Sequence, residues 1–217
     1  MNNCLKIAID MQNKYGIVQG LTLSLPGIIF IIIGSIIATF GLFYNAYPVV
    51  LGSMLISPIG NSIMRYCLGY VFNSSGFMTQ GINSLMAQIV IGLVIGYIME
   101  TVNYHIGDKF NLPTEEMESR TSTKNFVTDF LIALLCGFIL AYSIIHNQIF
   151  AIVGLSMVVA VLPPLVNTGV YISMAHHEHN IDKYNNNMTK AVRTFMLAMI
   201  NIVGISFASI IGLYLFC

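Results

Sequence analysis

Apolar stretches of about 20 residues recur along the whole chain, and they limit its fold more than any other feature. Uninterrupted stretches cover residues 26–44, 82–99, 126–145 and 194–216. A helix of this length crosses the roughly 30 Å hydrocarbon core of a bilayer. The pattern therefore predicts an all-α, polytopic transmembrane helix bundle, an integral membrane protein whose first partner is the lipid bilayer.

The charge content excludes a soluble enzyme. Only 8% of the residues are charged and 56% are hydrophobic, whereas a soluble domain carries about 25% charged residues. Net charge is zero and no basic run stands out, so no nucleic-acid partner is expected. No nucleophile, zinc or phosphate-loop motif occurs, and we expect neither catalysis nor a cofactor. The one metal-like cluster, His176–His179, is interpreted as an exposed loop.

Two further apolar segments are interrupted by proline. Residues 49–72 are broken at Ser57-Pro58, with Asn61 following, and residues 149–175 are broken at Pro163-Pro164, with Asn167 following. A proline inside a helix removes one hydrogen bond and clashes with a carbonyl, which costs about 3 kcal/mol. In hydrocarbon the freed carbonyls have no water, so such a break survives only inside protein or beside a wet cavity.

The order of these segments indicates an internal duplication. Both halves read as one span, one broken segment and one span, and Pro58-x-x-Asn61 aligns with Pro164-x-x-Asn167. If the unit crosses three times, its copy must insert upside down, which predicts inverted repeats. If the broken segments are re-entrant hairpins, each unit crosses twice and the repeats run parallel.

The predicted organisation has four parts. Residues 1–25 form a polar or interfacial segment, 26–100 the first transmembrane repeat, 101–125 a soluble linker, and 126–217 the second repeat. Polar loops are expected at residues 73–81 and 176–190. Glu100 is expected at the membrane interface, and Gln88 is expected to hydrogen-bond between helices.

Small residues spaced four apart predict close helix contacts, and one such face could also join two copies in a homo-oligomer. They are Gly92, Gly96, Ala133, Gly137, Ala141, Gly204, Ala208 and Gly212.

The candidate site gathers the residues at the two breaks. Free carbonyls, new helix N-termini and an amide could together bind a small solute or ion, or the amides could only satisfy the broken backbone. Arg65 shares a helix face with Asn61, and it either reaches the headgroups or attracts an anion. The candidate permeation residues are Ser57, Pro58, Asn61, Arg65, Pro163, Pro164 and Asn167.

The run of residues 49–58, the run of residues 158–164 with its paired prolines, and Arg120-Thr121 ahead of Asp129 carry a family resemblance. The chain resembles the domain of unknown function 389 family, whose members are multi-pass membrane proteins. The resemblance implies a fold and a location rather than an activity. Two functional hypotheses follow from the residues: a transporter or channel for a small solute or ion, and a membrane scaffold or assembly protein that transports nothing.

Overall fold

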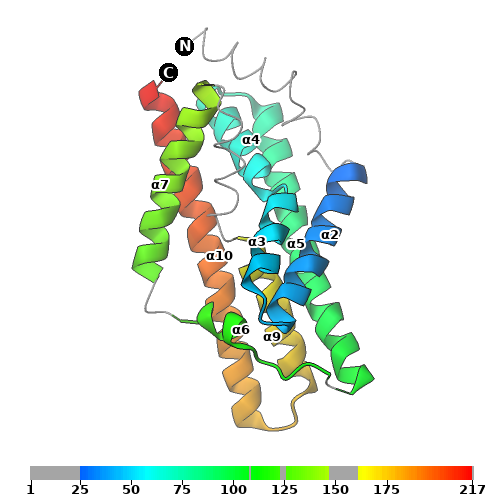
Figure 1. Cartoon of the computed structure of the whole chain (residues 1–217). Coiled ribbons are helices and arrows are strands. Elements are labelled where there is room, and N and C mark those ends of the chain that lie inside the picture. The colour runs from blue at the N-terminus through cyan, green and yellow to red at the C-terminus, as the bar shows by residue number, and fades with distance from the viewer. Residues whose placement is uncertain (1–24, 108, 123–125, 147–160, 217) are drawn as a thin grey trace.

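The computed structural model describes residues 25–107, 109–122, 126–146 and 161–216, and these residues form helices without any strand (Figure 1). The predicted all-α class is confirmed. The eight helices are α2 (Leu25–Phe43), α3 (Tyr47–Ile56), α4 (Ile59–Val71), α5 (Ser75–Ile106), α6 (Glu115–Ser119), α7 (Phe126–Ile145), α9 (Leu162–His177) and α10 (Ile181–Phe216).

Among the described helices, three (α5, α7 and α10) are long and apolar enough to cross a membrane, and α3 and α4 pass the same test together as a bent pair, which is either one broken span or a re-entrant loop. The apolar helix α2 packs beside them. Many large apolar side chains on these helices face outward, for example Leu135 and Phe207. In water such a surface would be unfavourable, whereas lipid matches it. The protein is therefore a multi-span integral membrane protein.

The helices pack as one bundle in which α10 and α5 make the most extensive contacts with other helices. Helix α10 lies along α7 and also contacts α9 and α4, while α5 contacts α4, α9 and α2 (Figure 1). Helix α2 packs on α3 and α9 as well. The buried core draws on all of these helices, including Leu42, Ile63, Leu165 and Ile205.

Small residues permit the close approach of α7 and α10. A Cβ atom added to Gly137 would lie 2.5 Å from the Ile205 carbonyl oxygen, and one added to Gly204 would lie 2.9 Å from Ala133 Cβ. Gly96 of α5 meets the backbone of α9 in the same way. The predicted packing role is confirmed. Because helices of the same chain already cover these faces, a homo-oligomer would need other surfaces.

The predicted break at Pro58 is confirmed. Helix α3 ends at Ile56, Ser57 is extended, and α4 starts after Pro58 with its axis bent by 42° from that of α3. Proline cannot donate the hydrogen bond that would continue α3. In the second half, Pro163 and Pro164 lie in the first turn of α9, where proline fits without strain. The predicted segment before them, residues 149–160, lies outside the described residues, as do residues 1–24.

The residue bounds predicted for three loops, 73–81, 101–125 and 176–190, are wrong because helices extend into them. Helix α5 begins at Ser75 and runs on to Ile106, so it covers most of the loop expected at 73–81 and the start of the linker. Helix α10 begins at Ile181, so only three residues separate it from α9. Hydropathy reports where a helix lies in hydrocarbon, whereas its end depends on capping. Asn180 accepts a hydrogen bond from the Asp182 amide at 2.9 Å, and Gly107 ends α5 with φ 96°.

Candidate functional site

The first break places its polar groups inside the bundle. The Ser57 hydroxyl oxygen is buried and has no hydrogen-bond partner among the described residues. Pro58 is buried and Asn61, one turn into α4, is half-buried. Because α3 stops just before Ser57 and Pro58 has no N–H, this corner holds more hydrogen-bond acceptors than donors. It is a polar point in an otherwise apolar span.

Arg65 lies one turn beyond Asn61 and is only 6% exposed. Its Nε and Nη1 atoms have no hydrogen-bond partner among the described residues. The guanidinium carbon lies 5.7 Å from the centre of the Phe77 ring, in the first turn of α5, which is a cation–π distance. An arginine that reaches the headgroups would expose its guanidinium, so the burial of Arg65 favours an interior role.

Asn167 of α9 is fully buried, and only one of its two amide atoms has a hydrogen-bond partner in the described structure. Its Nδ2 donates to the Met117 carbonyl oxygen at 3.0 Å, while its Oδ1 is buried without a hydrogen-bond partner in the described structure. Pro163 and Pro164 are buried one turn earlier. The structure thus buries Asn167 in the interior, whereas Asn61 stays half-buried.

The described residues of the predicted linker pack across one end of the bundle. Met117 of α6 is fully buried in the core. Thr114 caps α6 and donates to the Leu42 carbonyl oxygen at 2.6 Å, and the Glu116 amide donates to Asn45 Oδ1 at 2.9 Å. An apolar residue in a short acidic helix is the signal in the sequence that could have indicated this docking.

The Glu118 carboxylate fastens the same linker to the second half of the chain. It accepts a hydrogen bond from the Tyr171 hydroxyl of α9 at 3.3 Å and forms an ion pair with Lys190 of α10. Lys190 also lies over the Tyr171 ring, 5.7 Å from its centre. Residues 109–122 therefore connect α2, α9 and α10 and close this end of the bundle.

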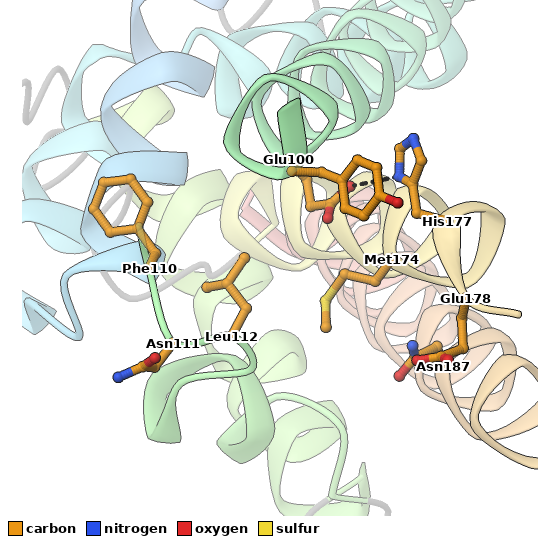
Figure 2. Close-up of a pocket in the computed structure, with 9 residues that line it drawn as sticks. Glu100, Phe110, Asn111, Leu112, Met174, His177, Glu178 and Asn187 are labelled. Carbon is orange, nitrogen blue, oxygen red and sulfur yellow. Dashed lines mark ion pairs between the residues drawn. The ribbon is translucent and has the colours of Figure 1, made fainter. Parts of the chain in front are cut away.

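A cavity of about 280 Å³ lies beside the linker at the same end of the molecule (Figure 2). Its walls come from the last turns of α5 and α9, the start of α10 and the chain after α5. The lining residues are Glu100, Tyr104, Phe110, Asn111, Leu112, Met174, His177, Glu178 and Asn187.

Glu100 and His177 form the polar centre of this cavity. Glu100 Oε2 lies 3.5 Å from His177 Nδ1, and the Glu100 side chain is only 5% exposed. The Tyr104 ring stacks on the imidazole of His177 with centroids 4.3 Å apart and planes inclined by 13°. One helix position earlier, the His176 ring contacts the Tyr97 hydroxyl at 2.5 Å.

The interpretation of His176–His179 as a free loop is therefore wrong for its first two residues, which end α9 and contact α5. The pair of Glu100 and His177 was missed because the two residues lie in separate helices. Each lies within two residues after the end of a predicted apolar segment, and that shared position was the available signal. Among the described residues, no three His, Cys, Asp or Glu side chains converge where a metal ion could bind.

A buried hydrogen bond also joins α4 and α5. Gln88 Nε2 donates to Ser62 Oγ at 2.7 Å, which confirms the interhelical role predicted for Gln88. The Gln88 Oε1 atom is buried and has no hydrogen-bond partner within the described part of the chain.

These features define a class: a polytopic α-helical membrane protein with a helix pair broken at proline, buried polar groups and a linker docked on one end of the bundle. The family model described as Domain of unknown function (DUF389) matches residues 54–207, from within α3 to within α10. The chain belongs to this family, which confirms the resemblance seen in its sequence. Neither a curated protein nor a solved structure matches the chain.

Proposed function

We propose that the protein is a transporter or channel for a small solute or ion, without enzymatic activity. The pathway runs through the interior of the bundle, past the break at Ser57-Pro58 and past Asn167. The linker closes it at the end where α6 docks.

The observation that carries this proposal is a set of buried polar atoms without hydrogen-bond partners in the described structure. They come from different elements of the bundle: Ser35 Oγ of α2, Ser57 Oγ at the break, Gln88 Oε1 of α5 and Asn167 Oδ1 of α9, with the Arg65 donors of α4. Leaving such a group unmatched costs about 1–3 kcal/mol. Water or a passing solute would satisfy these atoms, and lipid would not.

The proposal includes the internal duplication predicted from the sequence. We infer two inverted three-span units, with α2, α3–α4 and α5 in the first. The opposite directions of α2 and α7 in Figure 1 support this arrangement. Paired breaks in inverted units are the usual location of a transport site.

One contact favours the second candidate function, a membrane scaffold. The Asn167 amide donates to the linker backbone at Met117, which is how an amide with a purely structural role would act. In a scaffold the breaks only shape the bundle, and the linker stays docked.

Flux from proteoliposomes separates the two functions. Vesicles containing the purified chain are loaded in turn with K⁺, Cl⁻ and choline, and release is followed for each. We expect release of at least one probe, and a strong loss of it in the double variant Asn61→Leu/Asn167→Leu. Asn186→Leu, an exposed position on α10, is the matched control and keeps the flux.

The possible outcomes are distinct. An absence of release for all three probes from vesicles with correctly folded protein contradicts transport of small ions. Full release from the double variant excludes the two asparagines from the pathway. Monodisperse elution of each variant in detergent shows that a loss of flux is not a loss of fold.

A further inference from the structure

We propose that the solute of the transport function is a small inorganic anion, and that Arg65 of α4 is the residue that selects it. This inference rests on the proposed function and gives that function its substrate class. The observation that carries it is a buried positive charge for which the described residues hold no counter-charge.

The Arg65 guanidinium is enclosed by the bundle without a polar partner. The residue is 6% exposed, and its Nε and Nη1 atoms have no hydrogen-bond partner among the described residues. The ion pairs of the described structure use other cations: Arg120, His177, Lys183 and Lys190. The Phe77 ring, 5.7 Å from the guanidinium carbon, eases the burial of the charge but does not neutralise it.

The helices that pack on α4 carry their acidic residues far from Arg65. Helix α4 contains no acidic residue and packs mainly on α5 and α10. The single acid of α5, Glu100, lies roughly 35 Å beyond Phe77 at the helical rise of 1.5 Å per residue. The single acid of α10, Asp182, lies roughly 36 Å before Ser206 by the same rise. Ser206 marks the level of Arg65, because its carbonyl oxygen is 3.6 Å from Cys67 Sγ of α4.

Two further elements carry acids, and neither supplies the counter-charge. Asp129 lies in the first turn of α7, which packs along α10 and makes no extensive contact with α4. The acids of the linker helix α6 lie toward the opposite end of the bundle from α4 (Figure 1). Two of them, Glu116 and Glu118, are already paired with Arg120 and Lys190.

A buried charge without a counter-charge decides which ions can approach it. An arginine inside a membrane protein is unfavourable unless it is paired or serves a function. Water can accept hydrogen bonds from the free donors of Arg65, but only an anion also balances the charge. The same charge repels cations, and arginine or lysine side chains give anion pores their selectivity for this reason. We therefore expect the pathway to admit anions and to reject cations.

The enclosure of Arg65 limits the size of the anion. Both unpartnered nitrogens are closed off from solvent, and the Phe77 ring covers the guanidinium. A bulky organic anion would have to displace several packed side chains, whereas an ion of the size of chloride requires the smallest rearrangement. Chloride is therefore the probe for this site.

The first test measures charge selectivity in proteoliposomes loaded with KCl. Chloride release is followed with valinomycin present and K⁺ release with a protonophore present, so that neither flux is limited by its counter-ion. We expect chloride to leave at least about tenfold faster than K⁺, because one nearby charge attracts the first ion and repels the second. Arg65→Met should lose most of this preference. Arg193→Met, at an exposed position of α10, is the matched control and should keep it.

The second test detects the anion without any flux. Replacing gluconate by chloride at constant ionic strength should raise the Tm of the wild-type chain in detergent, because a ligand that binds the folded chain stabilises it. Arg65→Met should unfold at the same temperature in both salts, and Arg193→Met should follow the wild type. If Arg65→Met does not fold, Arg65→Lys replaces it: the charge and the anion preference remain, and the rise in Tm becomes smaller because fewer donors are present.

The outcomes separate this inference from the proposed function. A preference for K⁺, wild-type selectivity in Arg65→Met, or loss of all selectivity in Arg65→Lys would overturn the role of Arg65 and leave transport intact. Absence of flux, together with a chloride-dependent Tm that requires Arg65, would uphold the anion site and count against transport. A wild-type Tm that is the same in chloride and gluconate would overturn the site.

Discussion

Replacing Gly137 with alanine tests the closest contact between α7 and α10. The added Cβ would lie 2.5 Å from the Ile205 carbonyl oxygen, 2.7 Å from Ala208 Cβ and 3.0 Å from the Ser209 amide nitrogen. Two of these three neighbours are backbone atoms, which cannot rotate away. The helices must therefore separate, and the hydrogen bond from Ser209 Oγ to the Gly137 carbonyl oxygen, 3.0 Å long, is stretched as well.

The size of the effect follows from this geometry. Ordinary contact begins near 3.4 Å, so α7 and α10 must move apart by about 1 Å, and a gap of 0.5–1 Å loses a quarter to a half of the dispersion energy at each contact. Overpacking of this kind costs about 1–3 kcal/mol. The strained hydrogen bond adds up to about 0.6 kcal/mol, the average for membrane helices. We expect a loss near 2 kcal/mol, which lowers Tm by about 4–8 °C in a chain of this size.

The assay is thermal unfolding in detergent, with Gly52→Ala of α3 as the matched control. A Cβ atom on Gly52 meets nothing within 4 Å. Alanine there should keep the Tm or raise it slightly, because glycine lowers helix stability by about 0.5–1 kcal/mol relative to alanine. If Gly137→Ala unfolds at the wild-type temperature, or behaves like Gly52→Ala, the described approach of α7 and α10 is wrong.

Three further changes test other parts of the molecule. A double-mutant cycle of Ser62→Ala and Gln88→Leu should give a coupling of about 0.6 kcal/mol in unfolding, the average for polar contacts between membrane helices; additivity would mean that the bond is absent. Glu118→Gln should loosen the linker and speed its cleavage by trypsin, whereas Glu115→Gln should not; equal cleavage rates would contradict the docking. Arg65→Met should keep or raise the Tm, because it removes a buried charge with two unmatched donors, and should lower flux; a Tm well below wild type would make Arg65 structural.

The helices inside the membrane could be predicted from the sequence because lipid imposes a simple rule. Helix α7 begins and ends at the predicted residues 126 and 145, since its apolar block is bounded on both sides. Pro58 marks the end of α3 because proline acts on its own backbone, without help from distant residues. The apolar block and the proline each act on neighbouring residues, so their effects can be predicted from a single sequence.

The parts that were missed depend on contacts between distant segments. The docking of the linker requires Met117 to find the core beside Asn167, and the cavity requires Glu100 and His177 to meet across two helices. Hydropathy records neither. The ends of α5 and α10 were missed for a local reason. Each helix continues through polar residues as far as a cap, Gly107 after α5 and Asn180 before α10, and hydropathy does not report caps.

The contact of Asn167 with the linker bears on both candidate functions. On α9, Asn167 lies about two helical turns before Met174, which lines the cavity at the end of the bundle. In a scaffold the hydrogen bond from Asn167 to Met117 persists, and the buried Oδ1 of Asn167 stays unmatched at a permanent cost. In a transporter the bond opens with the linker, and the same amide then offers both its donor and its acceptor to the pathway. The two candidate functions thus predict different lifetimes for the hydrogen bond between Asn167 and Met117.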